Sequence, residues 1–472
     1  MITFGTDGWR AVISEEFTFG NVQTVSQAIA DFFNETTGAS IRKRKRIIVG
    51  YDTRFLSPTY ARLIAEVLSG NELNVLLVDR PTPTPSVCVA IKNQKLIGGV
   101  IVTASHNPYN FSGIKIKANY GGPATPEMTK QVESLLNKSQ IRWRSLEDSL
   151  KTGRVVVAEV EKEYITTVRD YLDMKAIKKG RYNILVDSMG GAGTRLIEKI
   201  LRGSSIKIDT IHGEPDPMFG RVNPEPIPHN LKTLLRLMRT GKYDLAIAND
   251  GDADRIGAFT ALGRFITPGQ ILGLLILHFK EHKGWSGAVV KTVSNSTMIN
   301  KICEALGIKL YETPVGFKHI CALMQEKKIL AGGEESGGIG VANYAPERDG
   351  MLLGLLLLEI MAIRKKPIHE LIGEMERRFG KFRYDRVDVH YPNEKKPILM
   401  QKLKNDPPKK LLGVTIKEVR TSDGVKYIAD DLSWLLLRLS GTEPILRIYA
   451  ESGSVNRTKK LLQFGQQLAY SV

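Results

Sequence analysis

The chain has 472 residues, 42% of them hydrophobic, and a formal net charge of +17. This length exceeds what one hydrophobic core supports and predicts several domains of about 100–200 residues. The most apolar run, Leu352 to Leu358, is shorter than the ~20 residues of a membrane-spanning helix, and the amino terminus lacks the basic start and apolar run of a signal peptide. Three scattered cysteines fit neither a disulfide framework nor a zinc site, so we expect a cytoplasmic protein.

The positive charge favours anionic partners, which include nucleic acid, an acidic membrane surface and phosphorylated small molecules. Its densest cluster, residues 42–46, directly precedes an apolar run at 47–50. No aromatic residues interleave with this cluster, and no familiar nucleic-acid-binding pattern accompanies it. We interpret the cluster as a solvated loop and expect neither nucleic acid nor a membrane as a partner.

The first part of the chain alternates between helical and strand-like patterns. Helices are predicted from about Thr18 to Phe33 and from about Thr59, and strands at 47–52, 74–78, 96–102 and 112–117. The last of these strands should return beside the loop that follows 96–102. Alternation of this kind is typical of an α/β sheet that lies between helices.

A similar strand, polar turn and helix recur at 182–201 and again at 288–306. We therefore predict three α/β domains of similar topology, at 1–150, 151–258 and 259–370, each with a mixed sheet between helices. Beyond about Pro367 the pattern changes to a helix, short strands and a stretch rich in lysine and proline. This change predicts a smaller α+β domain at 371–472.

The segment from Thr103 to Pro108 follows the apolar strand at 96–102 and reads Thr-Ala-Ser-His-Asn-Pro. Because a residue before proline is pushed out of the helical region, its last two residues predict a turn. Ser105 and His106 should therefore stand on a loop at the end of a strand, with their side chains presented outward. The serine is either a nucleophile or part of an ordinary hydrogen-bonded turn, and the segment alone leaves both interpretations open.

A second loop places acidic residues after a buried strand. Residues 245–248 are apolar, and Asp250, Asp252 and Asp254 follow at alternate positions. Three carboxylates converge only around something positive, because crowded like charges raise each other's pKa. Ligands that are all oxygen suit Mg²⁺ or Ca²⁺ rather than zinc. An EF-hand is excluded because its sixth and twelfth positions hold Arg255 and Ala261. The loop predicts a magnesium site that also uses a phosphate oxygen, with a solvated acidic turn as the alternative.

Two further segments have the composition of ligand-binding loops. Residues 332–338 combine glycines, which let a ligand approach the backbone, with acidic and hydroxyl side chains that suit sugar hydroxyls. Residues 435–444, with Arg447 nearby, offer hydroxyls, backbone N–H groups and an arginine, which suit a phosphate. Lys318 is a further candidate cation, although each of these features also occurs on ordinary protein surfaces.

In this order, and over nearly the whole chain, the segments resemble those of the α-D-phosphohexomutase superfamily. Residues 103–108 are similar to its active-site serine loop, and 250–255 to its magnesium loop. Residues 333–337 resemble its sugar-recognition loop, and 438–442 its phosphate-binding loop. The resemblance implies three α/β domains and a smaller C-terminal α+β domain around a central cleft. The same domains follow from the strand and helix patterns.

The resemblance also implies a phosphoprotein mechanism. Ser105 would carry a phosphoryl group to a sugar phosphate and form a 1,6-bisphosphate, which turns over and returns its other phosphate. Mg²⁺ would be held by Ser105 and the three aspartates. Lys115 with Arg10 would perform the acid–base step, with Lys318 and His106 as alternatives. Substrate contacts are expected from Arg255, Lys318, Glu334, Ser336, Arg438, Ser440, Gly441, Thr442 and Arg447. Ala11 and Leu439 depart from the common pattern without removing a functional group.

The form of the sugar loop bears on the substrate. Glu334-Glu335-Ser336 resembles the loop of phosphoglucomutases more than the Glu-Met-Ser or Glu-Gln-Ser forms of dual-specificity phosphomannomutases and phosphoglucosamine mutases. Glucose 1-phosphate and glucose 6-phosphate are therefore the expected substrates, with glucose 1,6-bisphosphate as intermediate and activator. Phosphomannomutase activity is the main alternative, and phosphoglucosamine mutase activity is a weaker one. An anionic-ligand binding protein and a phosphatase that uses the same serine are rival hypotheses, and either a monomer or a dimer fits.

Overall fold

The structure is a computed structural model that describes residues 2–5, 7–38, 40–41, 46–439 and 444–471. The chain divides into two compact units. The first contains residues 1–266, 321–327 and 336–369, and the second contains 267–320, 328–335 and 370–472. The chain passes between them at five points, and two of these lie within helices α13 (Phe317–Glu326) and α15 (Ile368–Phe379).

The first sheet has six strands in the order β1-β5-β4-β2-β3-β6. Strands β4, β2, β3 and β6 are parallel, whereas β5 runs antiparallel to both β4 and β1. Strands β2 and β4 are buried along their whole length, as expected for a sheet with helices on its faces. The strands are β1 (Trp9–Val12), β2 (Ile47–Tyr51), β3 (Val75–Val78), β4 (Gly98–Val102), β5 (Phe111–Ala118) and β6 (Val155–Ala158).

The helices of this part are α1 (Phe19–Thr36), α3 (Ser57–Gly70), α4 (Thr84–Asn93), α5 (Pro126–Leu135) and α6 (Leu146–Lys151). Thr18 begins α1 because its side chain accepts a hydrogen bond from the Asn21 N–H, which would otherwise have no partner in the first turn. The apolar faces of these helices and the sheet form one core, which includes Val25, Ile48 and Val100.

A second mixed sheet follows in the same unit, in the order β11-β10-β9-β7-β8. It comprises β7 (Asn183–Asp187), β8 (Lys207–Ile211), β9 (Leu245–Asn249), β10 (Ile256–Thr260) and β11 (Phe265–Ile266). The accompanying helices are α7 (Glu161–Tyr171), α8 (Met174–Lys179), α9 (Leu196–Ile200), α10 (Lys232–Met238) and a 3₁₀ turn at 219–221. Strands β6 and β10 extend the first two sheets past the predicted boundaries at 150 and 258.

The most apolar run of the sequence lies in helix α14 (Gly350–Arg364), which packs against β9 and β10. This helix is buried almost all round, which explains why it is apolar on every side. Within the described residues, no helix combines the length and apolar character needed to span a membrane. The short strand β15 (Ile339–Val341) also belongs to this unit.

The second unit contains a third group of parallel strands, in which β12 lies between β13 and β14. These strands are β12 (Ala288–Thr292), β13 (Leu310–Thr313) and β14 (Ile329–Gly333). Helix α11 (Pro268–Leu277), which continues into a π-helical turn at 278–282, packs against β14, and α12 (Met298–Ala305) packs against α11. The predicted α/β class is therefore confirmed for this third domain as well.

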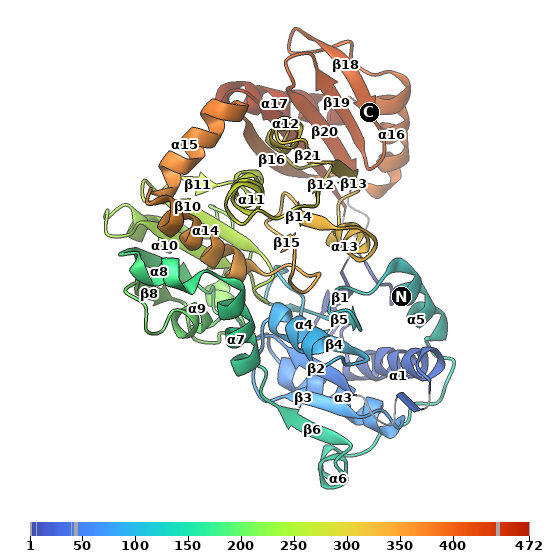
Figure 1. Cartoon of the computed structure of the whole chain (residues 1–472). Coiled ribbons are helices and arrows are strands. Elements are labelled where there is room, and N and C mark those ends of the chain that lie inside the picture. Colours follow the sequence, from blue (N-terminus) through green and yellow to red (C-terminus); the bar gives the residue numbers. More distant parts are fainter. Residues whose placement is uncertain (1, 6, 39, 42–45, 440–443, 472) are drawn as a thin grey trace. The chain divides into compact units, whose positions relative to one another are not determined.

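The C-terminal part is an antiparallel sheet in the order β16-β21-β20-β19-β18-β17 (Figure 1). Its strands are β16 (Arg383–His390), β17 (Lys410–Leu411), β18 (Val414–Arg420), β19 (Val425–Ala429), β20 (Trp434–Leu439) and β21 (Ile445–Ser452). Helix α17 (Val455–Tyr470) covers β16, β20 and β21, and α16 (Lys396–Asn405), preceded by a 3₁₀ turn at 393–395, contacts β19. This is the smaller α+β domain that the sequence predicts.

Candidate active site

Ser105 lies at the end of β4 in the first unit, as predicted, but its side chain is not presented outward. It is fully buried, and its Oγ donates a hydrogen bond of 2.8 Å to Asp250 Oδ2. The expectation of an exposed hydroxyl is therefore wrong, because the aspartate loop covers the serine. Ser105 also has a φ of 51°, a left-handed conformation that few residues other than glycine adopt.

The three aspartates follow β9 and form the compact group that the sequence predicts. One carboxylate oxygen from each of Asp250, Asp252 and Asp254 lies within 4.8 Å of the other two, and all three side chains are buried. Gly251, between the first two, packs against the backbone of Ser105. A Cβ atom added there would lie 2.6 Å from the serine carbonyl oxygen, so the close approach of the two loops requires glycine.

The donor set of this group fits a divalent cation. Asp252 Oδ1 and Asp254 Oδ1 are buried and have no hydrogen-bond partner among the residues described. Burial, together with the charges of Asp254 and Asp252, raises the pKa of Asp250 well above its ordinary value. A divalent ion would account for both the missing hydrogen bonds and the crowded charge. It is coordinated by carboxylate oxygens, and its own charge neutralises theirs.

Lys115 of β5 is the main counter-charge. Its ammonium lies 2.8 Å from Asp252 Oδ2, 3.0 Å from Asp254 Oδ2 and 2.9 Å from Asp7 Oδ2. Burial by itself would lower the pKa of Lys115, but these carboxylates raise it above its ordinary value. Arg348 completes the group with contacts of 2.6 Å to Asp7 and 2.8 Å to Asp254. We call Asp7, Lys115, Asp252, Asp254 and Arg348 the Lys115 cluster.

A second buried ion pair lies next to this cluster. Lys117, two residues after Lys115 on β5, donates a hydrogen bond of 2.5 Å to Glu347 Oε2 and lies 4.0 Å from Asp7 Oδ1. Thr84, at the start of α4, donates to Asp252 Oδ2 at 2.6 Å. Burial would raise the pKa of Asp252, but Lys115 and this hydrogen bond together lower it.

Two arginines approach the same region, Arg10 from β1 and Arg255 from the end of the aspartate loop. Arg10 of β1 donates a hydrogen bond of 2.8 Å to Asn107 Oδ1, within the serine loop. Burial lowers the pKa of the Arg10 guanidinium, although nearby Asp7 opposes the shift. Arg255 Nε lies 3.9 Å from Asp250 Oδ2. The structure thus brings together all the catalytic and metal residues predicted in the first unit, with His106 half-buried on the same loop.

The predicted phosphate-binding residues belong to the second unit. Arg438 on β20 and Arg447 on β21 are directly opposite each other across the strand pair. Like charges at such positions repel, and each of the two arginines has an acidic neighbour that offsets its charge. Arg438 donates to Asp423 Oδ2 at 2.8 Å, and Arg447 Nε lies 3.8 Å from Asp388 Oδ2. Ser440, Gly441 and Thr442 lie outside the described residues.

The remaining substrate candidates are divided between the units. Asp423 Oδ2 also accepts from the Val315 N–H at 2.8 Å, which ties the segment that contains Lys318 to Arg438. Glu334 is buried in the second unit, next to Glu335, whose Oε2 accepts from Thr292 at 3.0 Å. Ser336 is half-buried and belongs to the first unit.

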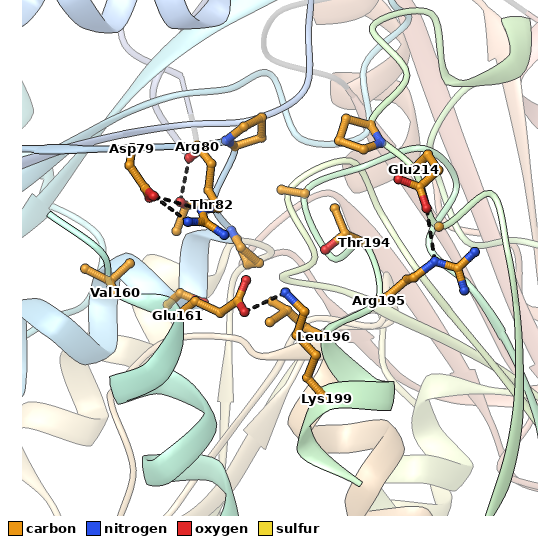
Figure 2. A pocket seen from close by; sticks show the side chains of 16 residues that line it. Asp79, Arg80, Thr82, Val160, Glu161, Thr194, Arg195, Leu196, Lys199 and Glu214 are labelled. Atoms are coloured by element: carbon orange, nitrogen blue, oxygen red, sulfur yellow. Dashed lines mark hydrogen bonds and ion pairs between the residues drawn. The ribbon is translucent and has the colours of Figure 1, made fainter. Parts of the chain in front are cut away.

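A separate cavity of about 240 Å³ lies in the first unit (Figure 2). Its wall includes residues 79–83, which directly precede Thr84, and residues 194–196. Within the described part of the chain, none of the predicted site residues lines it. Its charged side chains neutralise one another in pairs, as Figure 2 shows: Arg80 with Asp79 at 2.6 Å, Lys199 with Glu161 at 2.6 Å and Arg195 with Glu214 at 3.0 Å.

Several residues of the site were missed in the sequence. Its motifs do not single out Asp7, Glu347 or Arg348. The sequence contains two signals for them. Asp7 stands between two glycines, three positions before Arg10, and Glu347-Arg348-Asp349 is a charged run directly before an apolar helix. Neither signal reveals that Arg348 contacts Asp7, because 341 positions separate the two residues.

Comparison with known proteins agrees with this geometry. Four descriptions of the phosphoglucomutase/phosphomannomutase family match in order: alpha/beta/alpha domain I at residues 1–142, domain II at 162–263, domain III at 267–379 and the C-terminal domain at 387–464. A phosphoglucomutase/phosphomannomutase of Thermococcus kodakarensis is 30% identical over 98% of both chains. The chain belongs to the phosphoglucomutase/phosphomannomutase family. Its members are intramolecular phosphotransferases, and the resemblance to the α-D-phosphohexomutase superfamily is confirmed.

Other relatives of this phosphohexomutase carry different substrate names. A phosphoglucosamine/phosphogalactosamine mutase of Sulfurisphaera tokodaii is 31% identical over 97% of both chains. A solved structure from Thermus thermophilus, assigned as a phosphomannomutase, is 36% identical with a TM-score of 0.87 and covers 99% of this chain and 98% of its own. The reaction class is thus common to all three, whereas the sugar differs among them.

Proposed function

We propose that the protein interconverts glucose 1-phosphate and glucose 6-phosphate through a phosphorylated Ser105 and glucose 1,6-bisphosphate. The observation that carries the proposal is the hydrogen bond of 2.8 Å from the buried Ser105 Oγ to Asp250, one of three clustered aspartates. A hydroxyl used only to stabilise a turn has no need of three carboxylates around it. A phosphate carrier has such a need, because the carboxylates hold the cation that offsets the phosphate charge.

Mg²⁺ is the proposed ion, held by Asp250, Asp252, Asp254 and the oxygen of Ser105. When bound, it would neutralise charge on the phosphoryl oxygens. The unpaired buried oxygens of Asp252 and Asp254 support this assignment. Arg10 adds positive charge beside the serine loop, and Arg255 adds it beside Asp250.

Phosphoryl transfer here needs positioning and charge neutralisation. In the first half-reaction, the bond from Ser105 Oγ to phosphorus breaks and a bond from a sugar hydroxyl oxygen to phosphorus forms. The hydroxyl proton leaves the sugar, and Ser105 Oγ gains a proton. In the second half-reaction, the reoriented bisphosphate returns its other phosphoryl group to Ser105, and the proton moves back to the sugar. We propose Lys115, with Arg10 as its neighbour, for the proton transfer, and keep His106 and Lys318 as alternatives. The carboxylates that raise the pKa of Lys115 weaken it as a base, so this role depends on substrate binding changing those contacts.

The distal phosphate of the substrate is assigned to the second unit. Arg438 and Arg447 stand opposite each other on adjacent strands, and Ser440, Gly441 and Thr442 lie between them in the sequence. Because either end of the bisphosphate must occupy the reacting position, this one site must accept both phosphates. Glu334 and Ser336 are assigned to the sugar hydroxyls.

Glucose is proposed as the sugar because of the Glu334-Glu335-Ser336 sequence. Mannose phosphates are the second candidate, supported by the relatives whose names include phosphomannomutase. Steady-state assays with both sugars separate the two, and a higher kcat/KM for mannose 1-phosphate would reverse the preference. Amino sugar phosphates form a third arm of the same assay, because one relative is named for them.

The decisive experiment follows conversion of glucose 1-phosphate to glucose 6-phosphate with and without glucose 1,6-bisphosphate. The wild-type protein should turn over and respond to the bisphosphate, whereas Ser105→Ala should lose turnover and stay folded. Ser112→Ala is the matched control, because Ser112 is also buried in this region and its Oγ has no hydrogen-bond partner among the described residues. Intact-mass measurement should find one added phosphate on Ser105.

The rival hypotheses predict different results in that experiment. A phosphatase would release inorganic phosphate and ignore the bisphosphate. A protein that only binds anionic ligands would show no turnover with any sugar phosphate. Substantial activity in Ser105→Ala would rule out the serine as the phosphate carrier.

A further inference from the structure

The segment Asp52-Thr53-Arg54 lies next to the serine loop although it is not part of it. Strand β2 ends at Tyr51, which is paired in parallel with Val102 at the end of β4. The segments after the two strands therefore leave the sheet at the same edge, and the Asp52 N–H still donates to the Val102 carbonyl at 3.0 Å. This placement allows Arg54 to reach the backbone of the serine loop.

Arg54 is fully buried, and its guanidinium uses every N–H group that it has. Arginine offers five such donors in a fixed planar arrangement. Its Nε donates to Asp52 Oδ2 at 3.1 Å, and the other four donors go to three backbone carbonyls of the serine loop and to that of the first residue of β5. These acceptors are Ser105 O at 2.7 Å, Asn107 O at 2.6 Å, Pro108 O at 2.6 Å and Phe111 O at 3.0 Å.

The backbone N–H of Ser105 is also held in place, through Thr103, by the carboxylate of Asp52. Ser105 N donates to Thr103 Oγ1 at 2.9 Å, and Thr103 Oγ1 donates to Asp52 Oδ2 at 2.7 Å. Asp52 itself is fixed by Ser57 Oγ at 2.9 Å and by the Arg54 N–H at 2.9 Å. The buried ion pair of Asp52 and Arg54 therefore holds both backbone groups of Ser105. Its carbonyl is bound directly by Arg54, and its N–H is linked to Asp52 through Thr103.

These hydrogen bonds hold Ser105 in an unfavourable backbone conformation. A serine in the left-handed region costs about 1 kcal/mol or more relative to an ordinary conformation and persists only where surrounding contacts hold it. The carbonyl of Ser105 faces Arg54, and its Oγ faces Asp250. A loop released from Arg54 could relax toward a commoner φ, and the hydroxyl would then leave the aspartates.

We propose that Arg54 is a positioning residue for phosphoryl transfer, because it holds the Ser105 loop in the conformation that directs Oγ at Asp250. The proposal rests on the function proposed above, in which Ser105 carries the phosphoryl group. Arg54 does not contact the reacting atoms and acts only through the loop backbone. A displacement of ~1 Å of a reacting group lowers the rate about 100-fold, which sets the size of the expected effect.

The first test is Arg54→Lys, because lysine keeps the charge but has three donors on one atom and cannot bind four carbonyls and a carboxylate. We expect kcat to fall about 100-fold while the KM for glucose 1-phosphate changes much less, because the sugar and phosphate contacts are untouched. Arg46→Lys is the matched control. Arg46 also donates to backbone carbonyls, those of Val75, Gly153 and Arg154, but it does so at the opposite end of β2, so its variant should keep kcat.

The second test is chemical rescue. In Arg54→Ala, added methylguanidinium should restore part of kcat in a saturable way, and it should leave Arg46→Ala unchanged. A merely structural role for Arg54 predicts a lower unfolding temperature with normal kcat below it, and that result would overturn the proposal. If Arg54 variants fail to fold, Thr103→Val provides a second test, because it removes the hydrogen bonds that link the Ser105 N–H to Asp52. Normal kcat in Thr103→Val would then count against the proposal.

The two proposals fail in different ways. If Ser105→Ala retains turnover, the serine is not the phosphate carrier and both proposals fail together. If Ser105→Ala is inactive while Arg54→Lys has the kcat of the wild type, only the role of Arg54 is wrong. Phosphate on Ser105, measured by intact mass, gives an independent reading, because a displaced loop should also slow phosphorylation of Arg54→Lys by glucose 1,6-bisphosphate.

Discussion

Two lysines, Lys115 in the first unit and Lys426 in the second, are both buried, but their surroundings shift their pKa values in opposite directions. Lys115 has three carboxylate oxygens within 3.0 Å, and they raise its pKa. Lys426 instead donates to the Val293 carbonyl at 2.5 Å and lies 3.9 Å above the ring of Trp434. Burial, with a smaller effect from Lys291, lowers the pKa of Lys426 to about 7.

The difference shows that burial alone does not set the charge of an internal lysine. Desolvation acts in the same direction on both residues, and the ionised neighbours decide the result. Around Lys426 the positive groups Lys291 and Arg420 offset the negative groups Glu312 and Glu451. We call Lys291, Glu312, Lys426, Trp434 and Glu451 the Lys426 cluster. Of these two clusters, the Lys115 cluster, which lies beside the proposed phosphate and metal site, has the excess of acidic groups.

The largest effect is expected from Lys115→Met. Methionine fills much of the volume but leaves the buried Asp252 and Asp254 and the partly exposed Asp7 without the cation that all three share. The loss of one partner from a buried ion pair typically costs about 3–5 kcal/mol. Turnover should fall at least ~1,000-fold if the lysine also transfers the proton. Urea unfolding and a mutase assay measure the two effects. Lys426→Met is the comparison variant, and equal destabilisation by the two substitutions would show that the clusters do not differ as described.

The second largest effect is expected from Mg²⁺, which should stabilise the folded protein through the aspartates beside Lys115 and not through the Lys426 cluster. An ion that binds only the folded state stabilises it by about 2.7 kcal/mol at 100 times its Kd. The wild type should therefore gain stability with added Mg²⁺, and Asp250→Asn should gain far less, because it loses one proposed ligand but keeps the contacts of Lys115. Lys426→Met should respond as the wild type does. Thermal unfolding with Mg²⁺ or EDTA checks this, and an unchanged response in Asp250→Asn would count against the metal assignment.

Whether a feature of this site can be predicted from the sequence depends on how far apart in the sequence the contacting residues lie. The serine and aspartate loops follow apolar strands and are punctuated by proline or glycine, so local patterns predict both. Their mutual contact required the resemblance, because the Ser105–Asp250 bond spans 145 positions. The burial of Ser105 was mispredicted, since a strand-end loop is exposed unless another loop covers it.

The role of Arg54 could not be read from the sequence for a related reason. Its partners depend on the pairing of β2 with β4, and a strand pattern does not state which strands are neighbours. The same holds for the Lys115 cluster, whose members come from β5, two loops and the segment before α14. The fold class and four-part architecture were predictable because they depend on the repetition of local patterns, not on individual pairings.

A smaller effect is expected from Lys426→Met as pH changes. The folded pKa of about 7 lies below the ordinary 10.5, so the unfolded chain binds the proton more readily between these values. Stability should therefore rise with pH above about 7, by up to about 1.4 kcal/mol per pH unit. Lys426→Met should flatten this rise between pH 7 and 9 in urea unfolding. Lys402→Met, on the exposed face of α16, should leave it unchanged, and an equal slope in all three proteins would contradict the lowered pKa.

The smallest effect is expected from Glu451→Gln, which tests whether the charge of Glu451 keeps the pKa of Lys426 from falling further. Glu451 Oε2 accepts from Thr297 N at 2.8 Å and from Trp434 Nε1 at 3.0 Å, and the glutamate raises the pKa of Lys426. Glu451→Gln keeps an acceptor for both donors but removes the charge, so the pKa of Lys426 should fall further. The rise of stability with pH would then begin below pH 7 and be steeper at pH 7 than in the wild type, with a loss of about 1 kcal/mol there. Unfolding between pH 6 and 8 measures this shift. A shift toward higher pH would mean that Glu451 does not act on Lys426 through its charge, and the contrast with the acid-rich surroundings of Lys115 would then need another cause.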